Sequence, residues 1–276
     1  MVGAASRRGR SVAGLIQDLY GDAAEGWASG AELVYSPLAA ALVESSPDDL
    51  AGALVLDVGA GTGAGSRALV DVSARPIAVD LVHGMLAHDR ERRPPAAVAD
   101  VCALPLSTDS FDAAIAPFVI NHLDRPTDGL RELGRVVRPG GAILASTFAE
   151  DERFPAKAII DDVAVLHGWV PTPAYRWLKQ HATPLTGRAE DVAALAREAD
   201  LVDVRAVEMA VELGISSPEA LVRYRFGQAH LSGWLASLSD AGRARLHDEA
   251  VRAVTAMDDQ STLTVTVVHL AARAAG

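Results

Sequence analysis

Short apolar runs alternate with amphipathic segments in the first half of the chain. Five of these runs predict buried strands, at residues 53–58, 76–80, 96–99, 111–116 and 141–147. The segments 64–73 and 127–138 between them predict helices. Continuous apolar strands that alternate with helices favour an α/β fold, in which a mostly parallel sheet is covered on both faces.

This alternation ends after residue 148. Residues 149–198 and 217–257 predict helices, with loops around Pro171, Pro173, Pro184 and Gly187, whereas 201–213 and 261–270 predict two late strands. The helical stretch of about forty residues between the late strands is too long for a plain connection, and such stretches are usually functional.

The pattern divides the chain into three parts. Residues 1–50 predict a helical segment at the amino-terminal side, and 51–148 the main α/β core. Residues 149–276 predict helical cap segments and the last two strands of the same sheet.

Composition narrows the class of protein. The chain has 276 residues, half of them hydrophobic, which is typical of a globular protein that can bury a real core. Its net charge of -11 disfavours nucleic acid and anionic lipid surfaces as partners. The single cysteine, Cys102, excludes an internal disulfide framework and a multi-thiolate metal site within this chain.

Targeting features are weak. Arg7, Arg8 and Arg10 are followed by a short apolar stretch that Gln17 and Asp18 interrupt, so we expect no signal peptide and a cytoplasmic location. Only two of the 25 basic residues are lysines, Lys157 and Lys179. Together with heavy use of alanine, this scarcity of lysine indicates a GC-rich genome. As a feature of composition it says nothing about function.

The segment Asp57-Val58-Gly59-Ala60-Gly61-Thr62-Gly63-Ala64 is the most informative part of the sequence. It follows the first predicted strand and opens a helix, where glycines allow a tight turn and a close approach to a ligand. Asp80 ends the second strand, where a carboxylate can accept both hydroxyls of a ribose. The arrangement predicts a nucleoside site.

Two nucleoside cofactors fit this turn. Gly59, Gly61 and Ala64 satisfy the GxGxxG/A pattern of dinucleotide sites, which alone is a weak signal. The alternative is S-adenosylmethionine (SAM). Asp57 favours SAM, because a carboxylate repels a pyrophosphate but attracts the ammonium group of a methionine moiety.

Four ordered motifs resemble those of class I SAM-dependent methyltransferases. They are 55–63 (VLDVGAGTG), 78–80 with Met85-Leu86, the segment from Asp100 through Leu104-Pro105-Leu106 to Ser110-Phe111-Asp112, and 135–141 (RVVRPGG). They cover residues 53 to 148, and one minor departure is Val101, where relatives often have alanine. The match is similar to the small-molecule branch, which includes ubiquinone, menaquinone and natural-product methyltransferases. It implies a Rossmann-like, doubly wound sheet of seven strands with an antiparallel last strand.

The resemblance also implies which residues bind SAM. Asp57 and the glycine turn would hold the methionine part, Asp80 the ribose, Leu81 and Met85 the adenine, and Asp100 the adenine amino group. Tyr20, in a segment that resembles the family's amino-terminal opening, and Tyr35 would reach the SAM carboxylate, or else only pack between helices. The full expected set is Tyr20, Tyr35, Asp57, Gly59, Ala60, Gly61, Gly63, Asp80, Leu81, Met85, Asp100, Val101 and Pro117.

Methyl transfer needs a base only where the acceptor must lose a proton. His122 follows the fourth strand and is the candidate, with a structural role at the helix start as the alternative. His167, His181 and His230 lie in the cap segments and are expected to be packing or surface residues, with contact to a substrate as the alternative. No cluster of residues has convincing metal spacing, so we expect no metal.

Aromatic side chains gather in the cap segments. Trp169, Tyr175, Trp177, Tyr224 and Trp234 are the predicted acceptor-binding residues, and at least two should line a pocket; the alternative is that they form the helix cores. Arg223 and Arg225 flank Tyr224 and are either solvated or an anchor for a carboxylate or phosphate.

The leading hypothesis is therefore SAM-dependent methyl transfer to a small, largely apolar or aromatic metabolite, in natural-product biosynthesis. One alternative is C-methylation of an alkene followed by carbocation cyclisation, which an aromatic cap could stabilise. Another is a SAM-binding partner protein without transferase activity. The acceptor, the methylated atom and the oligomeric state stay open, with a homodimer as one alternative.

Overall fold

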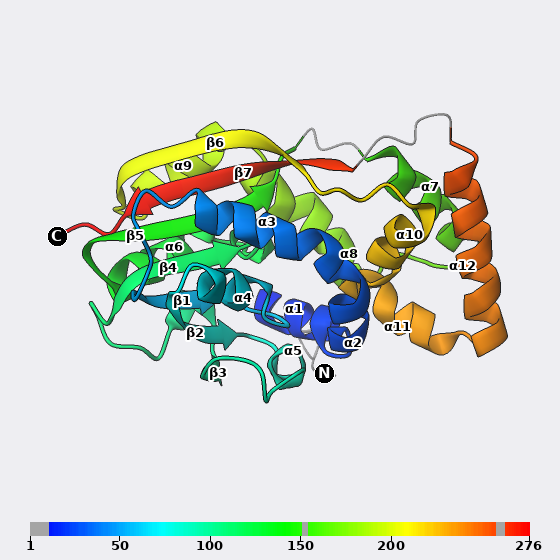
Figure 1. Cartoon of the computed structure of the whole chain (residues 1–276), viewed down its shortest axis with the longest axis horizontal. Helices are drawn as coiled ribbons and strands as arrows, with labels where there is room; N and C mark the ends of the chain where they lie inside the picture. Colours follow the sequence, from blue (N-terminus) through cyan, green and yellow to red (C-terminus); the bar gives the residue numbers. More distant parts are fainter. Residues whose placement is uncertain (1–10, 151–153, 258–262) are drawn as a thin grey trace, which may run out of the picture.

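A seven-stranded sheet forms the centre of the molecule (Figure 1). The computed structural model describes residues 11–150, 154–257 and 263–276, so Arg7, Arg8, Arg10 and the first residues of the predicted last strand lie outside it. The strands run in the order β3-β2-β1-β4-β5-β7-β6. Their bounds are β1 Leu54–Val58, β2 Arg75–Asp80, β3 Ala96–Val98, β4 Phe111–Pro117, β5 Val137–Phe148, β6 Val202–Glu212 and β7 Thr264–Arg273.

All neighbouring strands from β3 to β5 pair in parallel, with Val55 opposite Pro76 of β2 and Ala113 of β4. β7 is antiparallel to both β5 and β6. The order reverses between β1 and β4, which is where open α/β sheets bind ligands. The predicted fold class, a doubly wound sheet with an antiparallel last strand, is confirmed.

Two pairs of helices cover the faces of the sheet. α3 (Glu32–Glu44) and α4 (Ala64–Asp71) pack on one face, where Leu42 and Leu69 meet Val55 and Ile115. α6 (Pro126–Val136) and α9 (Ala189–Glu198) pack on the other. Burial on both faces explains why the central strands read as continuous apolar runs and not as alternating ones.

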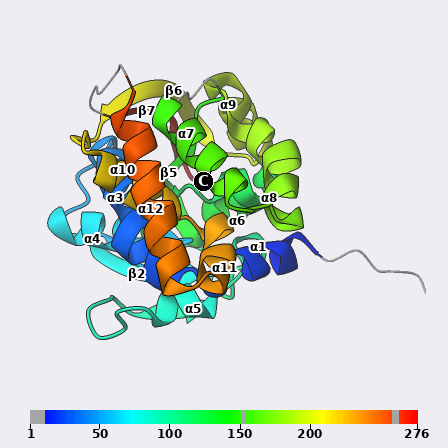
Figure 2. The ribbon, with the colours of Figure 1, turned by 90° about the vertical axis from the view of Figure 1, so that its right-hand side faces the viewer.

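A group of helices caps one end of the sheet, at the right of Figure 1 and facing the viewer in Figure 2. Val163 of α7, Val222 of α10 and Leu246 of α12 share a core with Val267 of β7. The cap helices are α7 Pro155–Leu166, α8 Pro173–Trp177, α10 Pro218–Phe226, α11 Ala229–Ser237 and α12 Asp240–Thr255. The remaining helices are α1 Val12–Tyr20, α2 Ala24–Gly26 and α5 His83–Ala87, with π-helical turns Trp27–Ala31 and Leu178–Ala182 and 3-10 turns Val101–Ala103, Ile120–His122 and Thr183–Thr186.

Several boundaries differ from the predictions. The helix predicted at 127–138 ends at Val136, and β5 begins at Val137, because that residue pairs with Phe111 across an irregular register. Pro173 was expected in a loop but starts α8, since proline is tolerated in the first turn of a helix. The last strand reaches Arg273, three residues past its predicted end.

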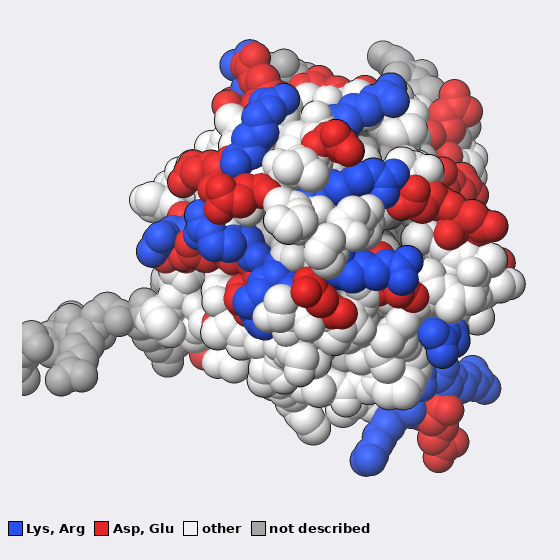
Figure 3. Space-filling view, turned by 90° about the vertical axis from the view of Figure 1, so that its left-hand side faces the viewer, with Lys and Arg blue, Asp and Glu red and all other residues white. Residues whose placement is uncertain are grey.

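The described part of the chain contains no helix that is long and apolar enough to cross a membrane. On the face shown in Figure 3, basic and acidic side chains are interspersed. The described residues also form ion pairs between oppositely charged side chains, such as Arg273–Asp48 and Arg138–Asp112.

Candidate functional site

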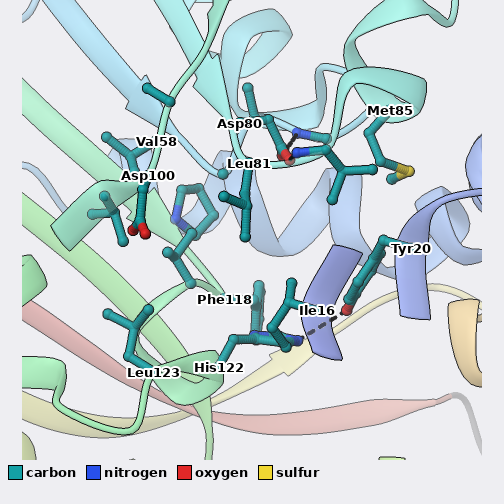
Figure 4. Close-up of a pocket in the computed structure, with 18 of the residues that line it drawn as sticks. Ile16, Tyr20, Val58, Asp80, Leu81, Met85, Asp100, Phe118, His122 and Leu123 are labelled. Carbon is teal, nitrogen blue, oxygen red and sulfur yellow. Dashed lines mark hydrogen bonds between the residues drawn. The ribbon is translucent and has the colours of Figure 1, made fainter. Parts of the chain in front are cut away.

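Two cavities adjoin at the carboxyl ends of the parallel strands. The first, of about 440 Å³, is lined by residues that follow β1, β2 and β4, and by α1 (Figure 4). The second, of about 290 Å³, lies between the sheet and the cap helices. Tyr20, Trp27, Tyr35 and His122 line both cavities, so these four side chains form the boundary between them.

The glycine turn after β1 shapes the first cavity. Gly59, Gly61 and Gly63 have φ angles of 63°, 53° and 104°, in the left-handed region that side chains disfavour. A Cβ at Gly59 would also collide with the side chain of Val119. The turn therefore needs glycine both for its backbone and for its close packing.

Asp57 is fully buried at the end of β1. Its Oδ2 accepts a hydrogen bond of 2.6 Å from the Ser66 hydroxyl, while Oδ1 has no partner among the described residues. Burial raises the pKa of Asp57 to about 7, and the nearby Asp80 adds to the increase. A buried carboxylate oxygen without a donor is an attractive site for a cationic or donor group of a ligand.

Asp80, at the end of β2, stabilises the turn from the other side. Its Oδ2 accepts from the Gly61 amide and its Oδ1 from the Val82 amide, each at 2.8 Å. Burial raises the pKa of Asp80, although these two hydrogen bonds oppose the increase. Each carboxylate oxygen has a second lone pair that remains available for a ligand hydroxyl.

Arg93 is a residue of this site that the sequence did not indicate. Its guanidinium donates to the Gly61 carbonyl at 3.0 Å, and its charge lowers the pKa of both Asp57 and Asp80. It comes from the loop before β3, where no motif marks it, so only the folded chain reveals the contact.

The far end of the first cavity is suited to a flat apolar ring. Met85 and Val101 are buried there beside Leu81 and Cys102. Asp100 caps the short turn that follows it, with Oδ1 accepting from the Cys102 amide at 2.9 Å. This carboxylate keeps its other oxygen for a donor on the ring.

Tyr20 and His122 are hydrogen-bonded at the boundary between the cavities. The Tyr20 hydroxyl lies 2.9 Å from Nε2 of His122 (Figure 4). Burial lowers the pKa of His122 to about 4, although a hydrogen bond to the main chain of Phe118 opposes this. Burial raises the pKa of Tyr20, so the hydroxyl is the donor and the neutral imidazole is the acceptor.

Aromatic rings continue the boundary into the second cavity. Tyr35 packs against Trp27 at a centroid distance of 4.6 Å and edge-on against Phe118 at 5.1 Å. Phe118 and Phe148 are 4.6 Å apart. Phe118 has a φ of 57°, an unusual conformation for a bulky residue, and such strain is often found at functional sites.

Two of the five predicted acceptor residues line the second cavity, Tyr175 and Tyr224. Trp169 does not line it but packs behind, 6.1 Å from Tyr175. Trp177 and Trp234 also lie outside its lining, since Trp177 stacks on His181 and Trp234 joins the cores of the cap helices. Phe148 and Phe154 line the cavity instead.

The second cavity is more polar than the sequence suggested. Arg225 is only 1% exposed, and its guanidinium binds both carboxylate oxygens of Asp161, at 2.6 and 2.7 Å. Of the two arginines expected to be solvated, only Arg223 is exposed. His230 lines the cavity with 6% of its surface exposed, and its ring stacks on Tyr175 at 4.0 Å.

The other cap histidines have surface roles. His167 pairs with Glu249 at 2.9 Å, which links α7 to α12. Within the described ranges, no three His, Cys, Asp or Glu side chains gather in a way that could hold a metal ion.

The structure brings the predicted nucleoside-site residues together. All thirteen line the first cavity except Gly63, which starts α4 beside it. The cavity also includes residues without a motif, notably Ile16 of α1, Trp27, Phe118 and Leu123.

Residues 56–145 match a family model described as a methyltransferase domain. Among curated proteins, a demethylmenaquinone methyltransferase of Renibacterium salmoninarum is 33% identical over 120 residues, which are 43% of this chain and 51% of that protein. One from Clavibacter sepedonicus is 40% identical over 105 residues, 36% of this chain and 43% of that protein. The matched region thus spans about half the length of these relatives.

Solved structures show the same fold at low identity. Phosphoethanolamine N-methyltransferase 2 of Haemonchus contortus, solved with S-adenosylhomocysteine, superposes with a TM-score of 0.55 at 19% identity, covering 87% of this chain and 52% of that one. The [4+2]-cyclase SpnF superposes with a TM-score of 0.52 at 20% identity, covering 87% of this chain and 81% of the cyclase. Because the cyclase has the same fold, the architecture does not by itself define the reaction.

Proposed function

We propose that this chain, a class I SAM-dependent methyltransferase of the small-molecule type by its domain match and fold, binds SAM in the first cavity and its methyl acceptor in the second. The observation that carries the proposal is the shared boundary. Tyr20, Trp27, Tyr35 and His122 line both cavities, so ligands in the two would meet at these residues.

The residues of the first cavity fit SAM. Asp57 offers a buried carboxylate oxygen without a donor, which suits the methionine ammonium. Asp80 has lone pairs for the ribose hydroxyls, and Met85 and Val101 would enclose the adenine while Asp100 accepts from its amino group. A dinucleotide fits less well, because Asp57 would face a pyrophosphate.

When bound, SAM supplies a methyl group already activated by its sulfonium. The chain's own residues orient the acceptor and exclude water, which provides much of the acceleration in such displacements. His122 is neutral with Nε2 directed at the boundary, so it can accept a proton from an acceptor hydroxyl or amine that takes the place of Tyr20.

The experiment is calorimetric titration of the protein with SAM, S-adenosylhomocysteine and NADH, followed by incubation with methyl-labelled SAM and small-molecule fractions. Binding of both adenosyl compounds without NADH, and label in a small molecule, are expected. NADH binding in the absence of SAM binding would contradict the proposal. SAM binding without transfer to any fraction would favour the alternative of a non-catalytic SAM-binding partner protein.

The aromatic boundary favours a second candidate reaction, C-methylation of an alkene. Trp27, Tyr35, Phe118 and Phe148 form a chain of ring contacts with centroid distances of 4.6, 5.1 and 4.6 Å between successive rings. Aromatic faces stabilise cations. The carbon skeleton of the product, determined by NMR, distinguishes this reaction from O- or N-methylation. Natural-product biosynthesis and a cytoplasmic location stay predictions from the sequence.

A further inference from the structure

The boundary between the two cavities consists of uncharged side chains. The described residues that line both cavities are Tyr20, Trp27, Tyr35 and His122. Burial raises the pKa of both tyrosines and lowers that of His122 to about 4, so all four side chains are neutral at physiological pH. A cation at this boundary would therefore have no ionised partner among the side chains that form it.

Three of these side chains are aromatic rings that meet at an angle. The ring centroid of Trp27 lies 5.5 Å from that of Tyr20 and 4.6 Å from that of Tyr35. The interplanar angles are 60° and 36°, so the three rings do not form a flat stack. Aromatic faces attract cations, and groups of such rings form the cages that bind quaternary ammonium ligands. The boundary thus has the chemistry of a site for a cation without a hydrogen-bond donor.

The backbone that carries Trp27 is closely packed. Trp27 begins the π-helical turn Trp27–Ala31, a conformation that often occurs at functional sites. Gly30 of this turn packs against α10, where a Cβ would collide with the main-chain oxygen of Arg223. A Cβ at Gly227, directly after α10, would collide with the main chain of the turn. This close contact between two backbones fixes the segment that presents the indole.

A methyl donor would place a cation at this boundary. The sulfonium of SAM has a permanent positive charge and carries the methyl group that is transferred. With SAM in the first cavity and the acceptor in the second, this methyl group has to pass between the side chains that both cavities share. S-adenosylhomocysteine has the same adenosyl and amino acid parts but lacks both the methyl group and the charge. The two ligands therefore differ at the point where the rings lie.

We propose that the faces of Tyr20, Trp27 and Tyr35 bind the sulfonium of SAM and favour the charged donor over its neutral product. The inference rests on the proposed function. It gives Trp27 a role in cofactor binding that the sequence did not indicate, and it assigns the two tyrosines to the sulfur, where the family resemblance implied the carboxylate.

The test is calorimetric titration of the parent protein and two variants with SAM and with S-adenosylhomocysteine. Trp27→Leu should bind SAM about 3- to 30-fold more weakly than the parent does, because a cation–π contact is lost. Its affinity for S-adenosylhomocysteine should stay within about twofold. Trp27→Phe keeps an aromatic face at a size close to that of leucine, so it should lose less SAM affinity than Trp27→Leu.

The matched control is Phe226→Leu, which removes an aromatic ring of α10 that lines neither cavity. This variant should keep the parent ratio of the two affinities, and circular dichroism verifies that all variants are folded. A second measurement needs no variant. In the complex of the parent protein with methyl-¹³C-labelled SAM, the methyl proton signal should lie upfield of its position in free SAM, because aromatic faces shield the nuclei above them.

An equal loss of affinity for both ligands in folded Trp27→Leu, or a methyl signal that does not move upfield, overturns the inference. If Trp27→Leu does not fold, the methyl signal decides. If both ligands bind and their affinity ratio is the same in the parent and in Trp27→Leu, the proposed function stands and this inference fails. If the parent binds neither ligand, the proposed function itself fails.

Discussion

Asp80 is the residue whose replacement tests the nucleoside site most directly. Asp80→Ala should weaken SAM binding by about 30- to 150-fold, which corresponds to about 2–3 kcal/mol, since two ligand hydroxyls lose a charged acceptor. Asp80→Asn should lose less, because its amide oxygen can still accept one bond. Calorimetry measures both affinities, with circular dichroism as the check on folding.

Asp80 also stabilises the glycine turn, so Asp80→Ala removes more than a ligand contact. Asp80 also accepts from the amides of Gly61 and Val82, so its removal loosens the glycine turn as well. The residue lies at a strand end, and the fold should survive. A folded Asp80→Ala protein that binds SAM as tightly as the parent would show that the ribose lies elsewhere.

Asp57 predicts a pH-dependent affinity for SAM. Its pKa of about 7 means that the free protein holds a proton at pH 6, and this proton must leave before the carboxylate can pair with an ammonium group. The amine of SAM itself becomes more fully protonated over the same range, which partly offsets this loss. The affinity for SAM should therefore fall about fivefold from pH 7.5 to pH 6. Methylthioadenosine, which lacks the ammonium, is the matched ligand, and its affinity should not follow this trend. A SAM affinity that is flat over this range would place the ammonium away from Asp57.

His122 should titrate far below a free imidazole. Its pKa of about 4 keeps it neutral throughout the physiological range, as a proton acceptor must be. NMR titration of the imidazole signals, assigned with His122→Asn, gives the pKa directly, and a pKa near 6.5 would contradict the buried environment.

Replacement of His122 should affect turnover and not cofactor binding. For an acceptor that loses a proton, His122→Ala should lower kcat by about 10²- to 10⁴-fold and leave SAM affinity within a few-fold.

At the scale of elements, β7 carries a second pH effect that is independent of catalysis. His269 is 2% exposed, neither ring nitrogen has a partner among the described residues, and burial lowers its pKa to about 4. An unfolded imidazole has a pKa of about 6.5, so the unfolded state takes up more protons and stability is lost as the pH falls below that value.

The parent protein should therefore lose about 1–2 kcal/mol between pH 7 and pH 5 relative to His269→Gln. Urea unfolding of both proteins at both pH values measures the difference. Asp57 acts in the opposite direction, but equally in both proteins, so it does not affect the comparison. If the free energy of unfolding changed with pH equally in the parent and in His269→Gln, the ring of His269 would be solvated in the folded protein.

The elements also show why the sequence predicted most of the residues that line the first cavity but only a few of those that line the second. The glycine turn, Asp80 and Asp100 follow strands directly, so local sequence fixes both their identity and their position. The second cavity is built from α7, α8, α10 and α11, whose relative placement depends on packing between distant segments. No local pattern distinguishes Tyr175, which lines the cavity, from Trp169, which packs behind it.

At the scale of the whole molecule, the mostly parallel sheet of seven strands and its antiparallel last strand followed from the alternation of elements and the family resemblance, whereas the order of the strands came from the structure. The net charge of the chain did not predict which charged side chains line its cavities. A chain with 36 acidic and 25 basic residues places both lysines and a buried arginine around one cavity, because total charge does not determine local charge.

The position of the two lysines has a practical consequence for labelling chemistry. A reagent that acylates primary amines would find only Lys157 and Lys179 among the side chains of these 276 residues. Coupling to a sensor surface through lysine would therefore tether the protein by its second cavity and obstruct it. The same reactivity makes amine acylation a footprint of that cavity, since an occupant that covers the lysines should protect them while the other side chains stay unmodified.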